Sequence, residues 1–130
     1  MDTPGEIDGL LPLTPAVFHI LLALAGGERH GYGIMQEVVA STRGQMRIGA
    51  GTLYRSIKQL IASRMIEESD ERPDPALDDE RRRYYRLTDF GRRVAQAEAE
   101  RLERLVSEAR ARRLLEGHAE GRPGVLGGLG

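Results

Sequence analysis

The sequence predicts a mostly α-helical domain with one small β-hairpin, and three observations support this prediction. Apolar residues recur at helical spacing in four segments between Pro15 and Leu115. Two short strand-like segments, 66–69 and 81–87, flank an acidic, proline-containing stretch that breaks any helix. The chain has 130 residues, of which 40% are hydrophobic and 30% charged, which is typical of one folded domain.

The composition also excludes several classes of protein. Without cysteine the chain has no disulfide, no thiolate nucleophile and no cysteine-ligated zinc. The first ten residues carry acids and no base, so we expect no secretory leader. The longest apolar run, 17–25, is too short for a membrane-spanning helix, which needs roughly 20 residues. We therefore expect a cytoplasmic protein that does not enter a membrane.

The first elements follow from prolines, glycines and caps. Residues 1–12 should form an N-terminal arm, because prolines and glycines interrupt them and their apolar residues lack a helical period. Thr14 and Pro15 predict a helix start, and the glycines after Ala25 predict its end. This helix is apolar nearly all round and should be the most buried. A second amphipathic helix is predicted over about 30–42.

The third predicted helix has the clearest pattern. Its apolar residues follow the spacing i, i+4, i+7 and i+8, at Leu53, Ile57, Leu60 and Ile61. The opposite face contains no acid and carries Thr52, Arg55, Lys58, Gln59 and Ala62, with Tyr54 on the flank.

A hairpin with a long acidic loop follows, and its second strand, 81–87, carries arginines on both faces. Thr88 is predicted to cap a last helix that extends to about Leu115. This helix has an apolar stripe formed by Phe90, Val94, Leu102, Leu105, Val106 and Ala109. The glycine-rich residues 117–130 should be a disordered tail.

This order of elements matches a winged helix-turn-helix, in which the third helix enters the major groove and the hairpin lies along the DNA backbone. The charge distribution agrees, because residues 43–66 sum to +5, 67–80 to −7 and 81–97 to +5 within a net charge of −1.

We divide the chain into the arm 1–12, a winged-helix domain 13–87, a dimerisation helix 88–116 and the tail 117–130.

Three motifs point to a family. Residues 30–34 read HGYGI, residues 51–60 read GTLYRSIKQL, and residues 83–88 read RYYRLT with Gly91 after them. From about Leu13 to Leu115 the chain resembles the PadR family of bacterial winged-helix transcriptional regulators. The resemblance implies a homodimer joined by the terminal helix that represses a nearby promoter. It also allows a small-molecule effector, since family members respond to phenolic or drug-like compounds.

Two departures from the family pattern stand out. Arg64 and Met65 occupy the place where the family usually has a glycine before the first wing strand. The wing loop, 70–80, is unusually acidic. Because acids repel phosphates, we expect the loop tip to point away from DNA or to stay disordered.

The predicted site residues form two groups. The residues expected to contact double-stranded DNA, on a pseudo-palindromic operator, are Tyr32, Thr52, Tyr54, Arg55, Lys58, Gln59, Arg81, Arg82, Arg83 and Tyr84. Of these, Arg55 and Gln59 are expected to read base edges. The residues expected to form the dimer interface are Val94, Leu102, Leu105, Val106 and Ala109, because so long an apolar stripe needs a partner.

Other interpretations stay open from the sequence. The main alternative is a winged-helix dimer that binds a protein or small ligand without binding DNA, which the acidic loop and the near-neutral charge favour. For Tyr54, the alternative to a DNA contact is packing against the wing. His19 is expected to be a hydrogen-bonded core or interface histidine, and His30 is expected to cap or brace the second helix. The sequence shows no catalytic constellation, metal triad or cofactor motif, so we expect no enzyme, metal or cofactor.

Overall fold

The computed structural model describes residues 4–69 and 83–116. The wing loop, Arg81, Arg82 and the predicted tail lie outside the described residues. The elements, in chain order, are α1 (Pro4–Asp8), α2 (Pro15–Ala25), β1 (Arg29–His30), α3 (Gly31–Ser41), α4 (Ala50–Ala62), β2 (Ile66–Ser69), β3 (Tyr84–Leu87) and α5 (Asp89–Ala111). The chain forms two compact units, of which the first ends at Glu98 and the second begins at Ala99, so α5 contributes to both.

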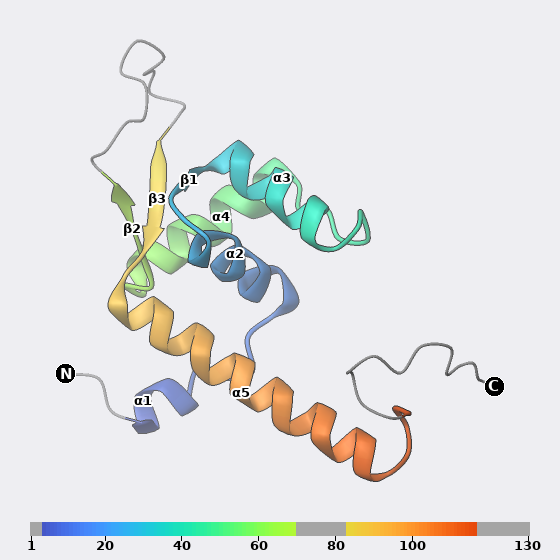
Figure 1. Ribbon diagram of the computed structural model, residues 1–130. Helices are drawn as coiled ribbons and strands as arrows, with labels where there is room; N and C mark the ends of the chain where they lie inside the picture. The colour runs from blue at the N-terminus through green and yellow to red at the C-terminus, as the bar shows by residue number, and fades with distance from the viewer. Residues whose placement is uncertain (1–3, 70–82, 117–130) are drawn as a thin grey trace. The chain divides into compact units, whose positions relative to one another are not determined.

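The core of the first unit lies where α2, α3 and α4 pack together beside the sheet (Figure 1). Its fully buried large side chains are Ile20, Leu21, Ile34, Val38, Leu53, Ile66 and Val94. The predicted start of α2 is confirmed, because the Thr14 hydroxyl accepts a hydrogen bond of 3.2 Å from the Val17 N–H. Leu22 of α2 remains 46% exposed, so α2 is not buried on every side in this chain.

The apolar pattern of α4 is confirmed with one exception. Leu53, Ile57 and Leu60 are each no more than 4% exposed, whereas Ile61 is 39% exposed. At about 100° per residue, Ile61 lies roughly 80° round the helix from Leu53. It therefore sits at the margin of the buried stripe rather than within it.

The sheet has three antiparallel strands in the order β1-β3-β2, one more than the hairpin that the sequence predicts. In the hairpin, Ile66 pairs with Leu87 and Ser69 with Tyr84. The extra strand, β1, places Arg29 opposite Tyr85 and His30 opposite Tyr84. A strand of two residues has no periodicity to detect, and its pairing with β3 is what defines it.

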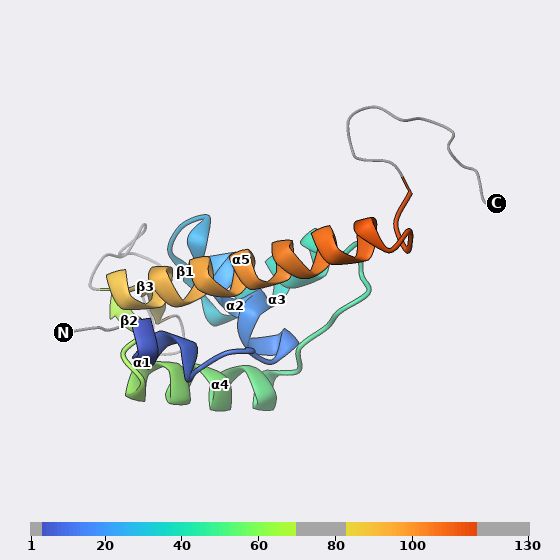
Figure 2. The same ribbon diagram turned by 90° about the horizontal axis from the view of Figure 1, so that it is seen from below.

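Residues 4–8 of the predicted arm form a short helix, α1, beside the C-terminal end of α4 (Figure 2). Ile7 of α1 packs against the core cluster. Glu6 accepts a hydrogen bond of 3.5 Å from Arg64, which follows α4. A helix of five residues is too short to be stable alone, so these contacts, rather than its sequence, account for it.

The junction between α4, β2 and α5 explains one departure from the family pattern. Arg64 has a φ of 65°, the left-handed conformation that favours glycine. Its N–H donates to the Ile61 carbonyl at 3.0 Å, and the Met65 N–H donates to the Leu60 carbonyl at 2.9 Å, which together form a Schellman cap. The family's glycine would fit this position, and here an arginine occupies it.

The same junction explains the spacing between Thr88 and Gly91. The Thr88 hydroxyl accepts a hydrogen bond of 2.9 Å from the Gly91 N–H and donates one of 2.6 Å to the Arg64 carbonyl. Gly91 lies directly against the Met65 carbonyl, so a Cβ at this position would collide with the backbone. Thr88 therefore caps α5, as predicted, and also fixes α5 to the end of α4.

The second unit contains the rest of α5, from Ala99 to Ala111. Leu102 and Ala109 are half-buried, whereas Leu105 is 54% and Val106 40% exposed. After the end of α5 at Ala111, Arg113 has a φ of 64° and forms a Schellman cap like that at Arg64. Arg43, with a φ of 55°, forms the same kind of cap after α3. Among the described residues, no helix has the combined length and hydrophobicity needed to cross a membrane.

Candidate nucleic-acid interface

The outward face of α4 is polar, cationic and free of acids. Thr52, Arg55, Lys58 and Gln59 are all exposed, opposite the buried side chains of Leu53, Ile57 and Leu60. Within the described ranges, Arg55 and Lys58 form no ion pair or hydrogen bond. Two unpaired cations on one helix face are available to bind phosphates or base edges.

The N-terminus of α4 is also open to a ligand. Gly49 is the N-cap and provides no side-chain hydrogen bond, so the first N–H groups of the helix lack an intrahelical partner. No atom lies within 4 Å of the position that a Cβ would take at Gly49 or Gly51. The end of the helix therefore presents backbone donors, with little steric hindrance, on the same element as Arg55 and Lys58.

Tyr54 connects α4 to the start of α3. Its hydroxyl lies so close to Gly31, the first glycine of the HGYGI motif, that a Cβ there would require the Tyr54 side chain to move. The side chain is nevertheless 43% exposed. Tyr54 therefore combines a packing role against α3 with a surface that remains accessible.

An aromatic row joins α3 to the wing. The His30 ring stacks on Tyr32 with centroids 6.4 Å apart and meets the edge of Tyr84 at 5.3 Å. The predicted cap is confirmed, because His30 Nδ1 accepts a hydrogen bond of 2.9 Å from the Gly33 N–H. Tyr32 is 61% exposed, whereas Tyr84 is half-buried, so Tyr32 is the more accessible of the two tyrosines.

The described arginines of the wing are paired with acids. Arg83 binds Glu68 at 2.9 Å, and Arg86 binds Glu67 at 2.8 Å and Glu28 at 3.5 Å. The hydrogen bond to Glu67 raises the pKa of Arg86 above its already high ordinary value. Sequence reasoning missed these partners, although pairing across the hairpin, which sets Glu67 opposite Arg86, was a signal that could have found one.

Glu28 also fixes the turn before β1 to the wing. It accepts a hydrogen bond of 2.8 Å from the hydroxyl of Ser69, which is 2% exposed, while it pairs with Arg86. Next to this cluster, burial raises the pKa of the Tyr85 hydroxyl, and the carboxylate of Glu68 raises it further. At the base of the wing, the charges of the arginines are therefore balanced by those of the glutamates beside them.

The remaining predicted residues lie in different environments. Val94, expected at a dimer interface, is fully buried in the core of the first unit. The Nδ1 atom of His19 is buried and has no hydrogen-bond partner among the described residues, so the expected hydrogen bond of this histidine is not seen at that atom. No group of three or more acids and histidines that could hold a metal ion occurs within 4–69 and 83–116.

Comparison with known proteins identifies the family. Residues 20–97, more than half of the chain, match the model of the transcriptional regulator PadR-like family. The chain belongs to this family. A comparison with curated proteins gives no match.

Solved structures with the same fold include other regulators. A transcriptional regulator from Clostridium thermocellum is 22% identical, with 89% of this chain and 100% of that chain aligned and a TM-score of 0.59. A PadR-like transcriptional regulator from Bacillus cereus is 18% identical, with 88% and 99% aligned and a TM-score of 0.61. RosR from H. salinarum is 24% identical, with 81% and 89% aligned and a TM-score of 0.56. This PadR-like chain therefore has the mostly helical fold with a small sheet that the sequence predicts.

Proposed function

We propose that this PadR-like regulator is a homodimeric repressor that binds a pseudo-palindromic operator near the promoter it controls. The observation that carries the proposal is the acid-free outer face of α4, with Arg55 and Lys58 exposed and unpaired among the described residues. In a winged helix-turn-helix this helix enters the major groove. The two copies of α4 would then occupy successive major grooves, roughly 34 Å apart. The proposed role is that of a DNA-binding regulator, not an enzyme.

The described residues suggest how the contacts are divided. In this proposal Arg55 and Gln59, both exposed on α4, read base edges, and Lys58 and the N-terminus of α4 bind phosphates. Arg83 and Arg86 already pair with acids, so they would have to exchange a carboxylate for a phosphate on binding. We infer that α4 supplies more of the affinity than the base of the wing does.

The exposed leucine and valine of α5 support the homodimer. Leu105 and Val106 leave an apolar surface in the second unit, and a second copy of the same helix would cover it. A small-molecule effector that relieves repression is part of the same proposal, on the grounds of family membership.

Fluorescence anisotropy tests DNA binding. The full-length protein is titrated, at several salt concentrations, onto its own upstream intergenic DNA and onto a scrambled duplex of equal length. Preference for the native duplex, with affinity that falls steeply as salt rises, supports the proposal. Equal and weak binding to both duplexes by a confirmed dimer contradicts it.

A matched pair of variants locates the interface. Arg55→Glu should lower affinity for the native duplex by about tenfold or more, because an acid replaces a groove-facing cation. Arg92→Glu makes the same change in charge at an exposed site on α5 and should leave affinity nearly unchanged at the same salt concentration. Equal losses in both variants would show a general charge effect instead of a contact by α4.

The second candidate is a winged-helix dimer that binds a protein or ligand without DNA. Its specific support is the wing, where Glu28, Glu67 and Glu68 pair with Arg83 and Arg86. Under this reading Arg55→Glu leaves partner binding intact, and the native duplex is bound no better than the scrambled one. The anisotropy titration therefore separates the two candidates.

A further inference from the structure

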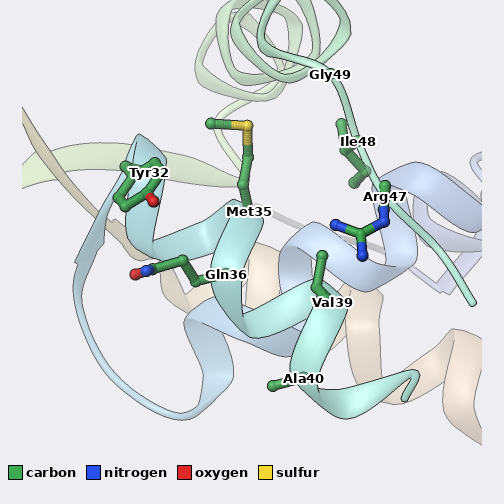
Figure 3. A pocket seen from close by; sticks show the side chains of 8 residues that line it. All are labelled: Tyr32, Met35, Gln36, Val39, Ala40, Arg47, Ile48 and Gly49. Carbon is green, nitrogen blue, oxygen red and sulfur yellow. The ribbon is translucent and has the colours of Figure 1, made fainter. Parts of the chain in front are cut away.

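A groove lies between α3 and the segment that leads into α4 (Figure 3). Its volume is about 490 Å³, and its lining includes Tyr32, Met35, Val39, Arg47, Ile48 and Gly49. Grooves and cavities that bind small ligands are typically about 300–1,000 Å³ in volume. This one is therefore large enough for a small organic molecule.

Most of the lining is apolar. The α3 residues lie at positions 32, 35, 36, 39 and 40, a helical spacing that places them along one side of the helix. Met35 and Val39 are half-buried, and Ile48 is 7% exposed, so they form a floor rather than isolated surface side chains. A ligand with an apolar body would remove this floor from water.

The polar end of the groove is positively charged. Arg47 is the cation of the lining, which contains no acid, and its guanidinium projects over Val39 (Figure 3). Arg47 has no ion pair or hydrogen bond with the described part of the chain. Gly49, at the same end, is the N-cap of α4, where uncapped N–H groups add positive potential. An anionic group fits this end better than a neutral or cationic one.

We propose that the groove binds an amphipathic carboxylate. The carboxylate accepts charge-assisted hydrogen bonds from the Arg47 guanidinium, and the apolar body lies on Met35, Val39 and Ile48. An inorganic anion would leave the apolar floor exposed, and an uncharged hydrocarbon would leave Arg47 unpaired. The two parts of the groove together select a molecule with one charged end and one apolar end.

The groove also touches the proposed DNA interface, and this part of the inference rests on the proposed function. Tyr32, an expected DNA contact, lines the groove, and the N-terminus of α4 adjoins it at Gly49. A carboxylate bound to Arg47 adds negative charge beside the path of the DNA backbone. Bound carboxylate therefore lowers DNA affinity, and by linkage DNA lowers affinity for the carboxylate by the same factor.

Methionine-methyl NMR of the full-length protein tests the site without DNA. The protein, labelled at the methionine methyl groups, is titrated with octanoate, octanol and octylammonium. Octanoate should shift the Met35 signal, assigned with Met35→Leu, and leave Met65 unchanged, because Met65 is 4% exposed and is not part of the lining. Octylammonium should bind at least about tenfold more weakly, since a cation loses the charge-assisted bond and meets Arg47 instead.

Two variants assign the charge recognition to Arg47. Arg47→Gln should lower affinity for octanoate about tenfold and leave affinity for octanol unchanged. Arg43→Gln removes an exposed cation from the preceding turn, outside the lining, and should have no such effect. No shift of Met35 with octanoate, or equal octanoate affinity in Arg47→Gln and the unchanged protein, overturns the proposal.

The effect of octanoate on DNA affinity is measured in a separate anisotropy titration. Octanoate at saturating concentration should weaken binding to the native duplex in the unchanged protein and much less in Arg47→Gln. If octanoate binds and DNA affinity does not change, the proposed competition between carboxylate and DNA is wrong, but the groove is still the carboxylate site. Failure of the protein to bind its native duplex would count against the proposed function, while the methionine titration would still decide the groove.

Discussion

At the scale of single residues, Gly91 is the position where the structure tolerates a side chain least. The Cβ of an alanine would collide with the backbone carbonyl of Met65, which also accepts a hydrogen bond of 3.0 Å from the Thr88 N–H. Because backbone cannot rotate away as a side chain can, Gly91→Ala should lower the free energy of unfolding by about 1–3 kcal/mol. Urea denaturation followed by circular dichroism measures this loss.

The control for Gly91→Ala is Gly51→Ala. Gly51 also lies in a helix, but no atom lies within 4 Å of its Cβ position. Alanine should therefore raise the free energy of unfolding there by about 0.5–1 kcal/mol, through lower conformational entropy of the unfolded chain. Similar changes in the two variants would show that helix propensity, not the approach of Met65, determines the effect.

At the scale of elements, three helices are followed, two residues after their last residue, by an arginine in a conformation that favours glycine. Arg43, Arg64 and Arg113 have φ values of 55°, 65° and 64°. Arg43→Gly should raise the free energy of unfolding by about 1 kcal/mol, because the left-handed conformation costs a residue with a Cβ roughly that much. Thermal and urea unfolding of the variant measure the gain.

The other arginines serve as comparisons. Arg43→Ala keeps the Cβ and should show no gain, which separates the backbone effect from loss of the side chain. Arg64→Gly should gain less than Arg43→Gly, because Arg64 also lies 5.4 Å from the Phe90 ring and pairs with Glu6. An equal gain in Arg43→Ala and Arg43→Gly would contradict the backbone explanation.

The wing gives the second prediction at this scale. In Glu68→Gln the carboxylate that pairs with Arg83 at 2.9 Å loses its charge, so a phosphate competes more effectively for the Arg83 guanidinium. Affinity for the native duplex should rise about threefold or more, and the slope of log affinity against log salt should steepen by about one. Asp8→Asn makes the same change in charge on α1 and is the control in the anisotropy titration. An unchanged salt slope in Glu68→Gln would mean that Arg83 does not reach the backbone.

At the scale of the whole molecule, the sequence predicted what local patterns encode. The helices at 15–25 and 50–62, and the Thr14 cap of the first, were predictable because apolar periodicity and capping residues act within a few positions. α1 and β1 were not, because contacts with distant residues, such as Arg64 and Tyr85, define them. The pairing of Arg83 and Arg86 with acids and the groove at Arg47 likewise depend on how elements meet. The exposure of the polar face of α4 was therefore predictable from the sequence, whereas the electrostatics of the wing required the structure.

The last prediction concerns assembly. Leu105 is 54% exposed in the second unit, so its replacement removes little packing within one chain. In a two-fold dimer each change occurs twice, and burying one leucine contributes about 1.5–3 kcal/mol. Leu105→Asp should therefore weaken dimerisation by about 100-fold or more. Each copy loses the free energy of burying one leucine and must also bury a carboxylate at the interface, and these costs add over the two copies. Sedimentation velocity over a range of concentrations measures this shift.

Ser107→Asp is the matched control for Leu105→Asp. Position 107 lies about 200° round α5 from position 105, on the opposite face, and is exposed. This variant should stay dimeric, and it should bind the native duplex as the unchanged protein does. A dimeric Leu105→Asp would place the interface elsewhere. A monomeric Leu105→Asp that lost its preference for the palindromic duplex, with Arg55 and Lys58 intact, would show that operator recognition requires both copies of α4.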